Sequence, residues 1–199
     1  MLSEDRSTEI EELVRRAQSG DESAFDVIAR RYRAAVLAVT FSRTQDRDDA
    51  EDLTQEVLVR AREKLKMLRE PGSFPAWLRT TALNVCRTWY RRSRPWPDSL
   101  DTIPDGLVAD AGPKPLEVLL EKEKQREFHR ALLSIPAANR YALLMHVWGG
   151  YSYDEISRFV EAPANTIAGR IHRAKTQLRR VLGSRAADEI CEPHRRTEQ

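Results

Sequence analysis

Cysteine is scarce in this chain: only Cys86 and Cys191 occur among 199 residues, and they lie far apart. Two distant thiols make neither a disulfide framework nor a zinc site. No glycine-rich phosphate loop is present, and the four histidines are scattered: His129, His146, His172 and His194. With no metal-ligand spacing and no nucleophile beside a base, we predict no catalytic residue, no metal and no cofactor.

Long apolar runs are also missing. No stretch approaches the roughly 18 consecutive apolar residues that a membrane span needs. The N-terminal segment MLSEDRSTEIEELVRR lacks the apolar core of a signal peptide. Charged residues make up 32% of the chain and hydrophobic ones 41%, a balance that allows packed cores in a soluble protein. We therefore expect a cytoplasmic protein without membrane insertion.

Strand alternation and internal repeats are absent, and apolar residues recur instead at helical spacing over residues 9–92 and again from residue 116. The segment between, 95–115, holds five of the ten prolines and four aspartates, which predicts an extended linker. The predicted fold is all-α, with two small helical bundles joined by this linker. The predicted divisions are 1–94, the linker 95–115, 116–183, and a polar tail 184–199 that we expect to be disordered.

The C-terminal bundle contains the pattern of a helix-turn-helix. Ser152-x-x-Glu155 is a capping box that predicts a helix start. After the break EAPAN, Asn165 or Thr166 is expected to cap a second helix. One stripe of that helix is apolar, and between residues 162 and 185 there are six basic residues and no acid. This predicts a recognition helix for the major groove. The alternative is a surface helix that is merely basic.

An arginine-rich helix is predicted at residues 74–92. From Arg79 to Arg94 there are five arginines and no acid, with Trp77, Trp89 and Tyr90 interleaved. Arginines for phosphates beside aromatic rings for unstacked bases are typical of proteins that bind melted DNA. The alternative is that the two tryptophans are core residues.

An acidic cluster precedes it, with six carboxylates between residues 46 and 56 against one base, Arg47. A helix start favours negative charge, which accounts for part of the cluster. A calcium loop is excluded, because Glu51 stands at the position that requires glycine and Val57 at the position that requires glutamate. The remaining interpretation is a docking surface for a basic partner, on the face shared by Asp52, Gln55 and Glu56.

These motifs together resemble a known family. DDAEDLTQEVLVRA, then FPAWLRTTALNVCRTWYRR, then YSYDEISRFVEAPANTIAGRIHRAKTQLRRVL are similar to the sigma-70 family of bacterial RNA polymerase initiation factors, and more narrowly to its extracytoplasmic-function group. The resemblance covers roughly residues 20–183. It implies a sigma factor that binds core RNA polymerase, recognises the −35 and −10 promoter elements and helps to open the DNA.

The resemblance also implies roles for particular residues. It implies binding to the β′ clamp helices of the polymerase by Asp49, Glu51, Asp52, Gln55 and Glu56. It implies −10 recognition by Trp77, Asn84, Arg87, Arg91 and Arg92, with a flipped-out base held in the loop 69–73. It implies −35 recognition by Thr166, Arg170, His172, Arg173 and Lys175, and contact of the C-terminal bundle with the polymerase β flap. It allows an anti-sigma protein as a further partner.

The chain departs from the family pattern in the turn of the helix-turn-helix. Glu161 and Asn165 stand where the family has glycine, and Ala168 stands where it often has a base. Two other function classes remain open from the residues alone. A free-standing dimeric helix-turn-helix regulator would account for residues 151–182 but not for the acidic and arginine-rich helices. An enzyme using the acidic cluster with a metal lacks any supporting ligand spacing.

Overall fold

The computed structural model describes residues 2–93 and 127–191, and within these ranges the chain is helical with no strand. The all-α prediction is therefore confirmed. The predicted linker, residues 116–126 of the helix expected after it, and residues 192–199 of the tail lie outside the described residues. The helices run in the order α1 (Leu2–Gln18), α2 (Glu22–Thr44), α3 (Arg47–Lys64), α4 (Phe74–Ser93), a helical segment at 127–133, α6 (Ala137–Gly149), α7 (Tyr153–Val160), α8 (Ala164–Leu182) and α9 (Ser184–Cys191).

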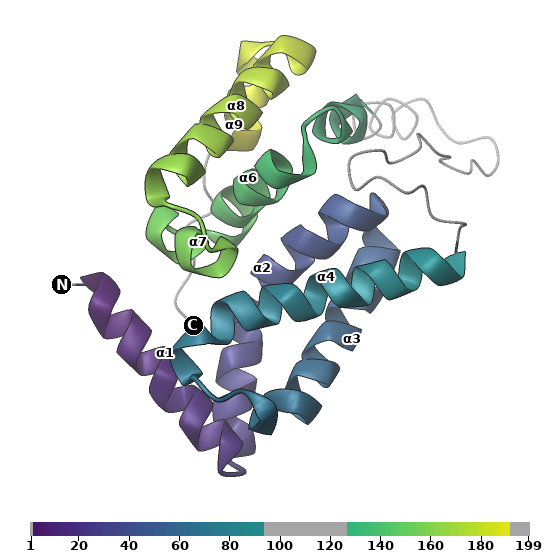
Figure 1. The fold of residues 1–199 in the computed structure, drawn as a ribbon. Helices are drawn as coiled ribbons and strands as arrows, with labels where there is room; N and C mark the ends of the chain where they lie inside the picture. The colour runs from purple at the N-terminus through teal and green to yellow at the C-terminus, as the bar shows by residue number, and fades with distance from the viewer. Residues whose placement is uncertain (1, 94–126, 192–199) are drawn as a thin grey trace.

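Helices α1 to α4 form an N-terminal half built around α2 (Figure 1). Asp21 caps the start of α2 by accepting a hydrogen bond from the Ala24 N–H at 3.1 Å. Its carboxylate also accepts from Ser23 and Arg16, which together hold its pKa at about 2. At the other end Gln45 takes a left-handed conformation that closes α2 and turns the chain into α3. The α1–α2 and α2–α3 connections are thus fixed locally.

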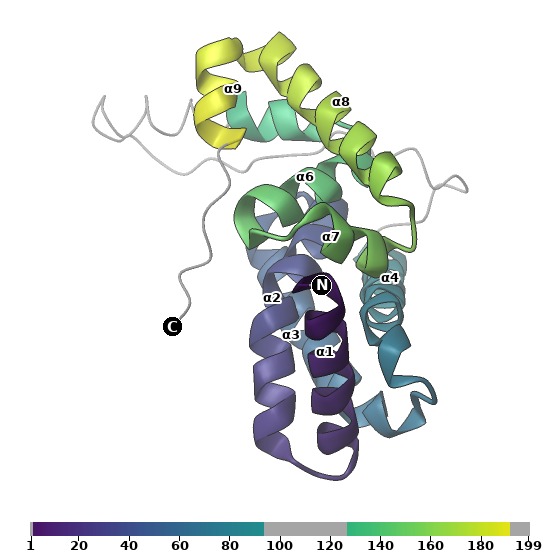
Figure 2. The ribbon, with the colours of Figure 1, turned by 90° about the vertical axis from the view of Figure 1, so that its left-hand side faces the viewer.

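The C-terminal half packs on the N-terminal half along α2 and α4 (Figures 1 and 2). Helix α6 lies against α2, and α7 lies against α4. The Phe41 and Trp148 rings are 5.5 Å apart, and Tyr32 stacks on Phe159 at 6.3 Å. We call this contact between the two halves the seam. The bundles predicted as separate units therefore share one continuous core.

Two polar anchors cross the seam. Arg140 on α6 is 3% exposed and donates hydrogen bonds to the carbonyl oxygens of Ile135, Leu133 and Ser42, the last across the seam at 3.3 Å. Burial lowers the pKa of Arg140 to about 10, so its guanidinium remains charged at neutral pH. The Tyr151 hydroxyl donates to the Arg31 carbonyl on α2. Each anchor satisfies buried polar groups that would otherwise be costly to leave unpaired.

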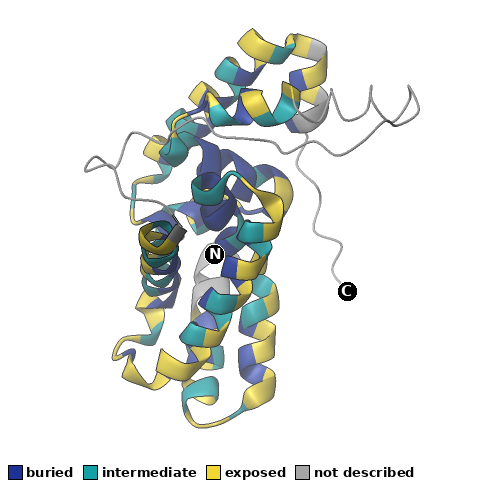
Figure 3. Cartoon of the chain, turned by 90° about the vertical axis from the view of Figure 1, so that its right-hand side faces the viewer, coloured by how far each residue is buried: buried dark blue, intermediate teal, exposed yellow. Residues whose placement is uncertain are grey.

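Sequence explains why α2 can serve both halves. Residues 35–42 contain Ala, Val, Leu, Thr and Phe on every side of the helix, and of them only Leu37 is not fully buried. A helix that is apolar all round is buried all round. Figure 3 shows the dark blue, buried residues gathered where the halves meet. The close approach of α6 to α2 depends on Gly149 of α6. Because glycine has no side chain, it leaves room for the Tyr151 ring.

The predicted disorder of residues 184–199 is wrong for its first half. Residues 184–191 form α9, which packs on α8 with Ala187 and Cys191 buried. These two residues are four apart and therefore share one face of the helix. That apolar spacing was present in the sequence, although it spans only two turns. Burial raises the pKa of the Cys191 thiol.

Candidate functional site

The acidic cluster lies at the start of α3 and along its outer face. Asp46 is the cap residue and accepts a hydrogen bond from the Asp49 N–H at 2.9 Å. Leu53 and Val57 face the core, with Thr54 buried beside them. On the opposite side Asp52 and Gln55 are exposed, Asp49, Glu51 and Glu56 are half-buried, and Val59 is 57% exposed. The residues assigned to polymerase binding therefore form one accessible face.

The charges on this face indicate that it does more than stabilise the start of α3. The pKa of Asp49 is raised, first by partial burial and then by the neighbouring charges of Asp46, Asp52 and Asp48. Two acids are partly neutralised by ion pairs, Glu51 with Arg47 at 3.2 Å and Glu56 with Arg60. A cluster of like charges that repel one another is unfavourable in the isolated protein, which favours an external partner as its purpose. No group of three potential metal ligands occurs among the described residues.

Helix α4 separates its apolar and basic residues cleanly. Phe74, Leu78, Ala82, Val85 and Cys86 are buried. The outer face carries the exposed residues predicted to bind the −10 element: Asn84, Arg87, Arg91 and Arg92. Burial raises the pKa of the Cys86 thiol to about 12, so this cysteine is unreactive.

The two tryptophans of α4 are half-buried and pack against the core. Trp77 lies 5.9 Å from the Phe74 ring, and Trp89 lies 5.1 Å from Tyr90. Their placement supports the alternative in which each ring is partly a core residue. Trp77 keeps an accessible part, but the basic face of α4 consists mainly of asparagine and arginine.

The helix-turn-helix has the predicted start and a different second cap. The capping box of Ser152 and Glu155 is present in full. The second helix begins at Ala164, so Asn165 and Thr166 lie in its first turn and neither caps it. Pro163 occupies the cap position, and its carbonyl accepts from the Thr166 and Ile167 N–H groups. The prediction failed because Pro163, whose extended conformation is favourable just before a helix, set the cap two residues before Asn165 and three before Thr166.

The apolar stripe of α8 is confirmed, with Ile167, Ile171, Ala174 and Leu178 buried. The residues predicted to bind the −35 element divide into two groups. Thr166, His172 and Arg173 are exposed. Arg170 and Lys175 are half-buried and point toward the protein, since Arg170 donates to the Tyr141 hydroxyl at 3.4 Å and Lys175 to the Cys191 carbonyl at 3.5 Å.

Helix α9 limits the far end of this basic face. Asp188 forms an ion pair with Arg179 at 2.8 Å, so part of the positive charge near the C-terminus of α8 is neutralised within the protein. The freely presented part is the first three turns, residues 164–174, which include the exposed Arg173 and form the end that enters the groove in helix-turn-helix proteins. Sequence analysis missed this division, because it depends on α9.

Glu161 in the turn adopts φ 55° and ψ 48°, a left-handed conformation that is strained for residues other than glycine. We expect Glu161→Gly to stabilise the protein by about 1 kcal/mol, raising the melting temperature by about 2–4 °C. Thermal unfolding followed by circular dichroism measures this. Glu161→Ala is the matched control, because it removes the carboxylate and keeps the strain; an equal gain in both variants would contradict the backbone explanation.

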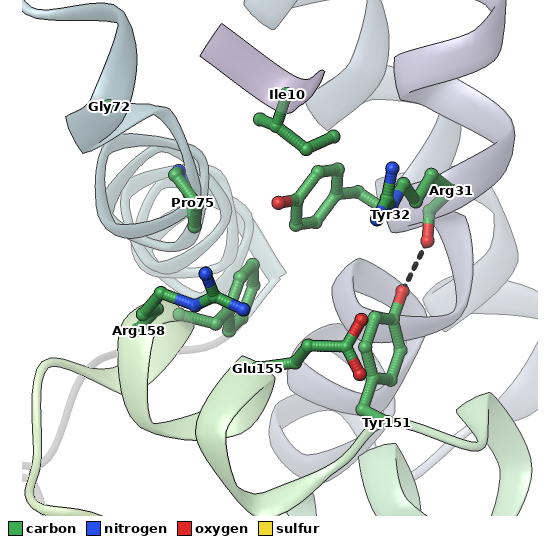
Figure 4. Close-up of a pocket in the computed structure, with 9 residues that line it drawn as sticks. Ile10, Arg31, Tyr32, Gly72, Pro75, Tyr151, Glu155 and Arg158 are labelled. Atoms are coloured by element: carbon green, nitrogen blue, oxygen red, sulfur yellow. Dashed lines mark hydrogen bonds between the residues drawn. The ribbon is translucent and has the colours of Figure 1, made fainter. Parts of the chain in front are cut away.

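A narrow cleft opens where the seam meets α1 (Figure 4). Ile10 and Tyr32 line it from the N-terminal half together with Pro75 at the start of α4. Glu155 and Arg158 line it from α7, beside the Tyr151–Arg31 hydrogen bond. The cleft lies apart from the exposed faces of α3, α4 and α8.

Comparison with known proteins gives consistent similarities. A family model for sigma-70 region 2 matches residues 28–95, and one for sigma-70 region 4 matches residues 125–178. RNA polymerase sigma-H factor of Pseudomonas aeruginosa is 29% identical over 179 residues, covering 86% of this chain and 93% of that protein. The ECF RNA polymerase sigma-E factor of Escherichia coli K12 is 28% identical over 173 residues, covering 83% and 90%.

Among solved structures, CnrH in complex with the cytosolic domain of CnrY has a similar fold. Its TM-score is 0.59 with 21% sequence identity, over 89% of this chain and 99% of that one. Within the helices that the structure describes, none is long and apolar enough to cross a membrane.

Proposed function

This chain belongs to the sigma-70 family of RNA polymerase factors, in its extracytoplasmic-function group, and we propose on that premise how it recognises and opens promoters. As an alternative sigma factor it binds core RNA polymerase and performs no catalysis of its own. The observation that carries the finer proposal is the presence, on one chain, of three separate exposed faces: acidic on α3, asparagine and arginine on α4, and basic on α8.

The face of α3 is the polymerase contact in this proposal. Its carboxylates bind basic side chains of the β′ clamp helices, and complementary charge favours both the rate and the register of docking. The exposed Val59, three residues beyond Glu56, adds an apolar contact at the C-terminal end of that face. The C-terminal half contacts the β flap, and an anti-sigma protein is a second partner that the family resemblance allows.

The face of α4 recognises and opens the −10 element. Asn84 reads a base edge, while Arg87, Arg91 and Arg92 hold the phosphates of the displaced strand. The loop 69–73 receives a flipped-out base, since a base must leave the stack before a protein can hold it there.

The face of α8 reads the −35 element in the major groove. Arg173 is exposed and lies in the presented part of the helix, so we expect Arg173→Ala to weaken −35-dependent binding by about 1–3 kcal/mol while polymerase affinity stays the same. Transcription from promoters with intact and scrambled −35 elements measures this. Arg180→Ala is the control: Arg180 is exposed near the C-terminal end of α8, where we assign it to a phosphate, and loss of a phosphate contact weakens binding to all sequences alike. Equal loss of polymerase binding and −35 dependence in Arg173→Ala would exclude a base contact.

The closed arrangement of the two halves cannot satisfy both promoter elements at once. Elements about 25 base pairs apart are separated by about 80 Å along the duplex. A compact chain of this length has a radius of gyration of about 16 Å, and hence a diameter of about 40 Å. In this proposal the seam therefore opens when the factor joins the polymerase, and the closed structure is the form present before that step.

Reconstitution tests the whole proposal. The purified protein is combined with bacterial core polymerase and a library of duplexes randomised at both elements, and transcripts are sequenced. Enrichment of paired elements at fixed spacing, with permanganate-reactive thymines around the −10 element, would support promoter selection and opening. A symmetric footprint by the protein alone, with no polymerase-dependent transcript, would favour the free-standing regulator instead.

A further inference from the structure

Helix α1 lies before the segment matched by the region 2 family model, which begins at residue 28. In the structure, however, α1 packs directly on the connection between α3 and α4 (Figures 1 and 2). This connection, residues 65–73, contains the short 3-10 turns η1 (Leu65–Met67) and η2 (Pro71–Ser73). We call it the α3–α4 loop. It includes the segment proposed above to hold the flipped-out base.

One side chain of α1 holds the backbone of this loop. The Gln18 amide nitrogen donates to the Leu65 carbonyl at 2.9 Å and to the Leu68 carbonyl at 2.7 Å. A primary amide has two N–H groups, so both bonds are made at the same time. The two carbonyls bracket η1 and lie 47 and 50 residues from Gln18 in the chain. These are long-range contacts that local helix formation does not require.

Other contacts also fix the backbone of the α3–α4 loop, while several of its side chains stay exposed to solvent. Leu65 and Leu68 are buried and anchor η1 in the core. Near η2, a side chain at Gly72 would lie 2.9 Å from the Glu11 carboxylate of α1, so the two segments touch there as well. Between the buried Leu65 and Leu68, Met67 is 75% exposed, and Arg69, which follows Leu68, is exposed as well.

We infer that Gln18 is a positioning residue for promoter selectivity, which fixes the α3–α4 loop in the geometry that discriminates bases at the −10 element. This inference rests on the proposed function of the loop. A site that selects one base must hold its groups to within about 0.5 Å, and loops reach that precision only through supporting contacts. Without Gln18, the Leu65 and Leu68 carbonyls lose their side-chain donor, and the loop is held only by the burial of these two leucines and by the packing of α1 against η2.

The test compares Gln18→Ala with Gln18→Lys and with a control, Glu12→Gln. Lysine supplies ammonium donors at similar reach and should restore the hold on both carbonyls. Glu12 is on the same helix, with its side chain 63% exposed and a long ion pair to Arg15 at 3.8 Å. Hydrogen exchange of the amides in residues 66–73 reports on loop order. Transcription of the randomised promoter library with bacterial core polymerase reports on base preference.

For Gln18→Ala we expect faster exchange confined to the loop, unchanged polymerase affinity, and a roughly three- to tenfold fall in the preference for the favoured base at one −10 position. Gln18→Lys should recover most of that preference, and Glu12→Gln should match the wild type. A purely structural role would lower total transcription without changing the preference between bases.

These measurements distinguish failure of the proposed function from failure of the inference about Gln18. If wild type shows no polymerase-dependent enrichment of any promoter, the proposed function itself is wrong. If wild type selects promoters and Gln18→Ala selects the same bases with equal preference, the inference about Gln18 is overturned, whatever the exchange rates. Loss of preference that Gln18→Lys fails to restore would also overturn it, because donation to the two carbonyls would not be the cause.

Discussion

The double variant Asp52→Lys/Glu56→Lys should lose at least a hundredfold in affinity for core RNA polymerase, with its fold intact. Both residues lie on the accessible face of α3, where neither contributes to the core. Placing two like charges against a basic partner removes favourable pairs and adds repulsion, and such changes cost about 3 kcal/mol or more in a close interface. Exposed acids contribute little to stability, so the thermal unfolding midpoint should change by only a few degrees. Binding is measured by co-elution and by fluorescence anisotropy at fixed salt.

A control with the same change in net charge separates specific docking from overall electrostatics. Glu12→Lys/Asp26→Lys reverses two exposed acids on α1 and α2, away from the acidic face. This variant should bind the polymerase nearly as well as the wild type, with at most a salt-dependent change in association rate. Equal loss of affinity in both double variants would show that only net charge matters, and the assignment of α3 as the docking surface would have to be abandoned.

Gly149→Ala should shift the protein toward an open state in which the two halves separate. A methyl group at this position would overlap the Tyr151 ring and would lie 3.4 Å from the Ala34 side chain on α2. The ring must move, and the hydrogen bond from its hydroxyl to the Arg31 carbonyl is then lost. Overpacking of this kind costs about 1–3 kcal/mol, enough to shift a closed-to-open ratio by roughly fivefold to a hundredfold. The C-terminal half keeps its own core, so helix content should not fall.

Opening is measured by small-angle scattering and by energy transfer between dyes on cysteines introduced at the exposed positions Asp26 and Arg180. Gly169→Ala is the matched control: it makes the same chemical change within α8, where the nearest neighbour is the Arg173 guanidinium at 3.5 Å. Its radius of gyration should equal that of the wild type. If Gly149→Ala also stays compact, the seam tolerates the methyl group, and Gly149 is not what permits closure. A faster association with polymerase in Gly149→Ala alone would further support opening as a step in binding.

Local pattern was sufficient for the presence of the helices before α9 and for the faces of α3, α4 and α8. Helical periodicity depends only on neighbours three and four residues away, and the capping box of Ser152 and Glu155 is a contact within one turn. The buried stripe of α8 was therefore predictable residue by residue. The roles assigned to the exposed side chains came from family resemblance and stay predictions.

Long-range packing was not predictable in the same way. The seam is formed by residues about 100 positions apart, such as Ser42 and Arg140, and nothing in the local sequence pairs them. The one available signal was the run at 35–42, which is apolar on every side and so requires cover from more than one direction. The contacts that turn Arg170 and Lys175 toward the protein are also long-range, since Arg170 bonds to Tyr141 and Lys175 to Cys191 of α9. Glu161 takes the left-handed conformation that ends α7, although glycine is the residue that local sequence preference favours there.

Opening of the seam in the absence of polymerase would make the protein prone to self-association and proteolysis. Separation of the halves would expose Phe41, Tyr32 and Phe159 to water, together with the remainder of Trp148. A contiguous aromatic patch of this kind promotes self-association, and the exposed end of α2 would be open to proteases. If the seam opens as proposed, copies that open without polymerase are the ones exposed to aggregation and degradation. We therefore expect the Arg140 and Tyr151 anchors to protect the unbound factor as well as to hold its two halves together.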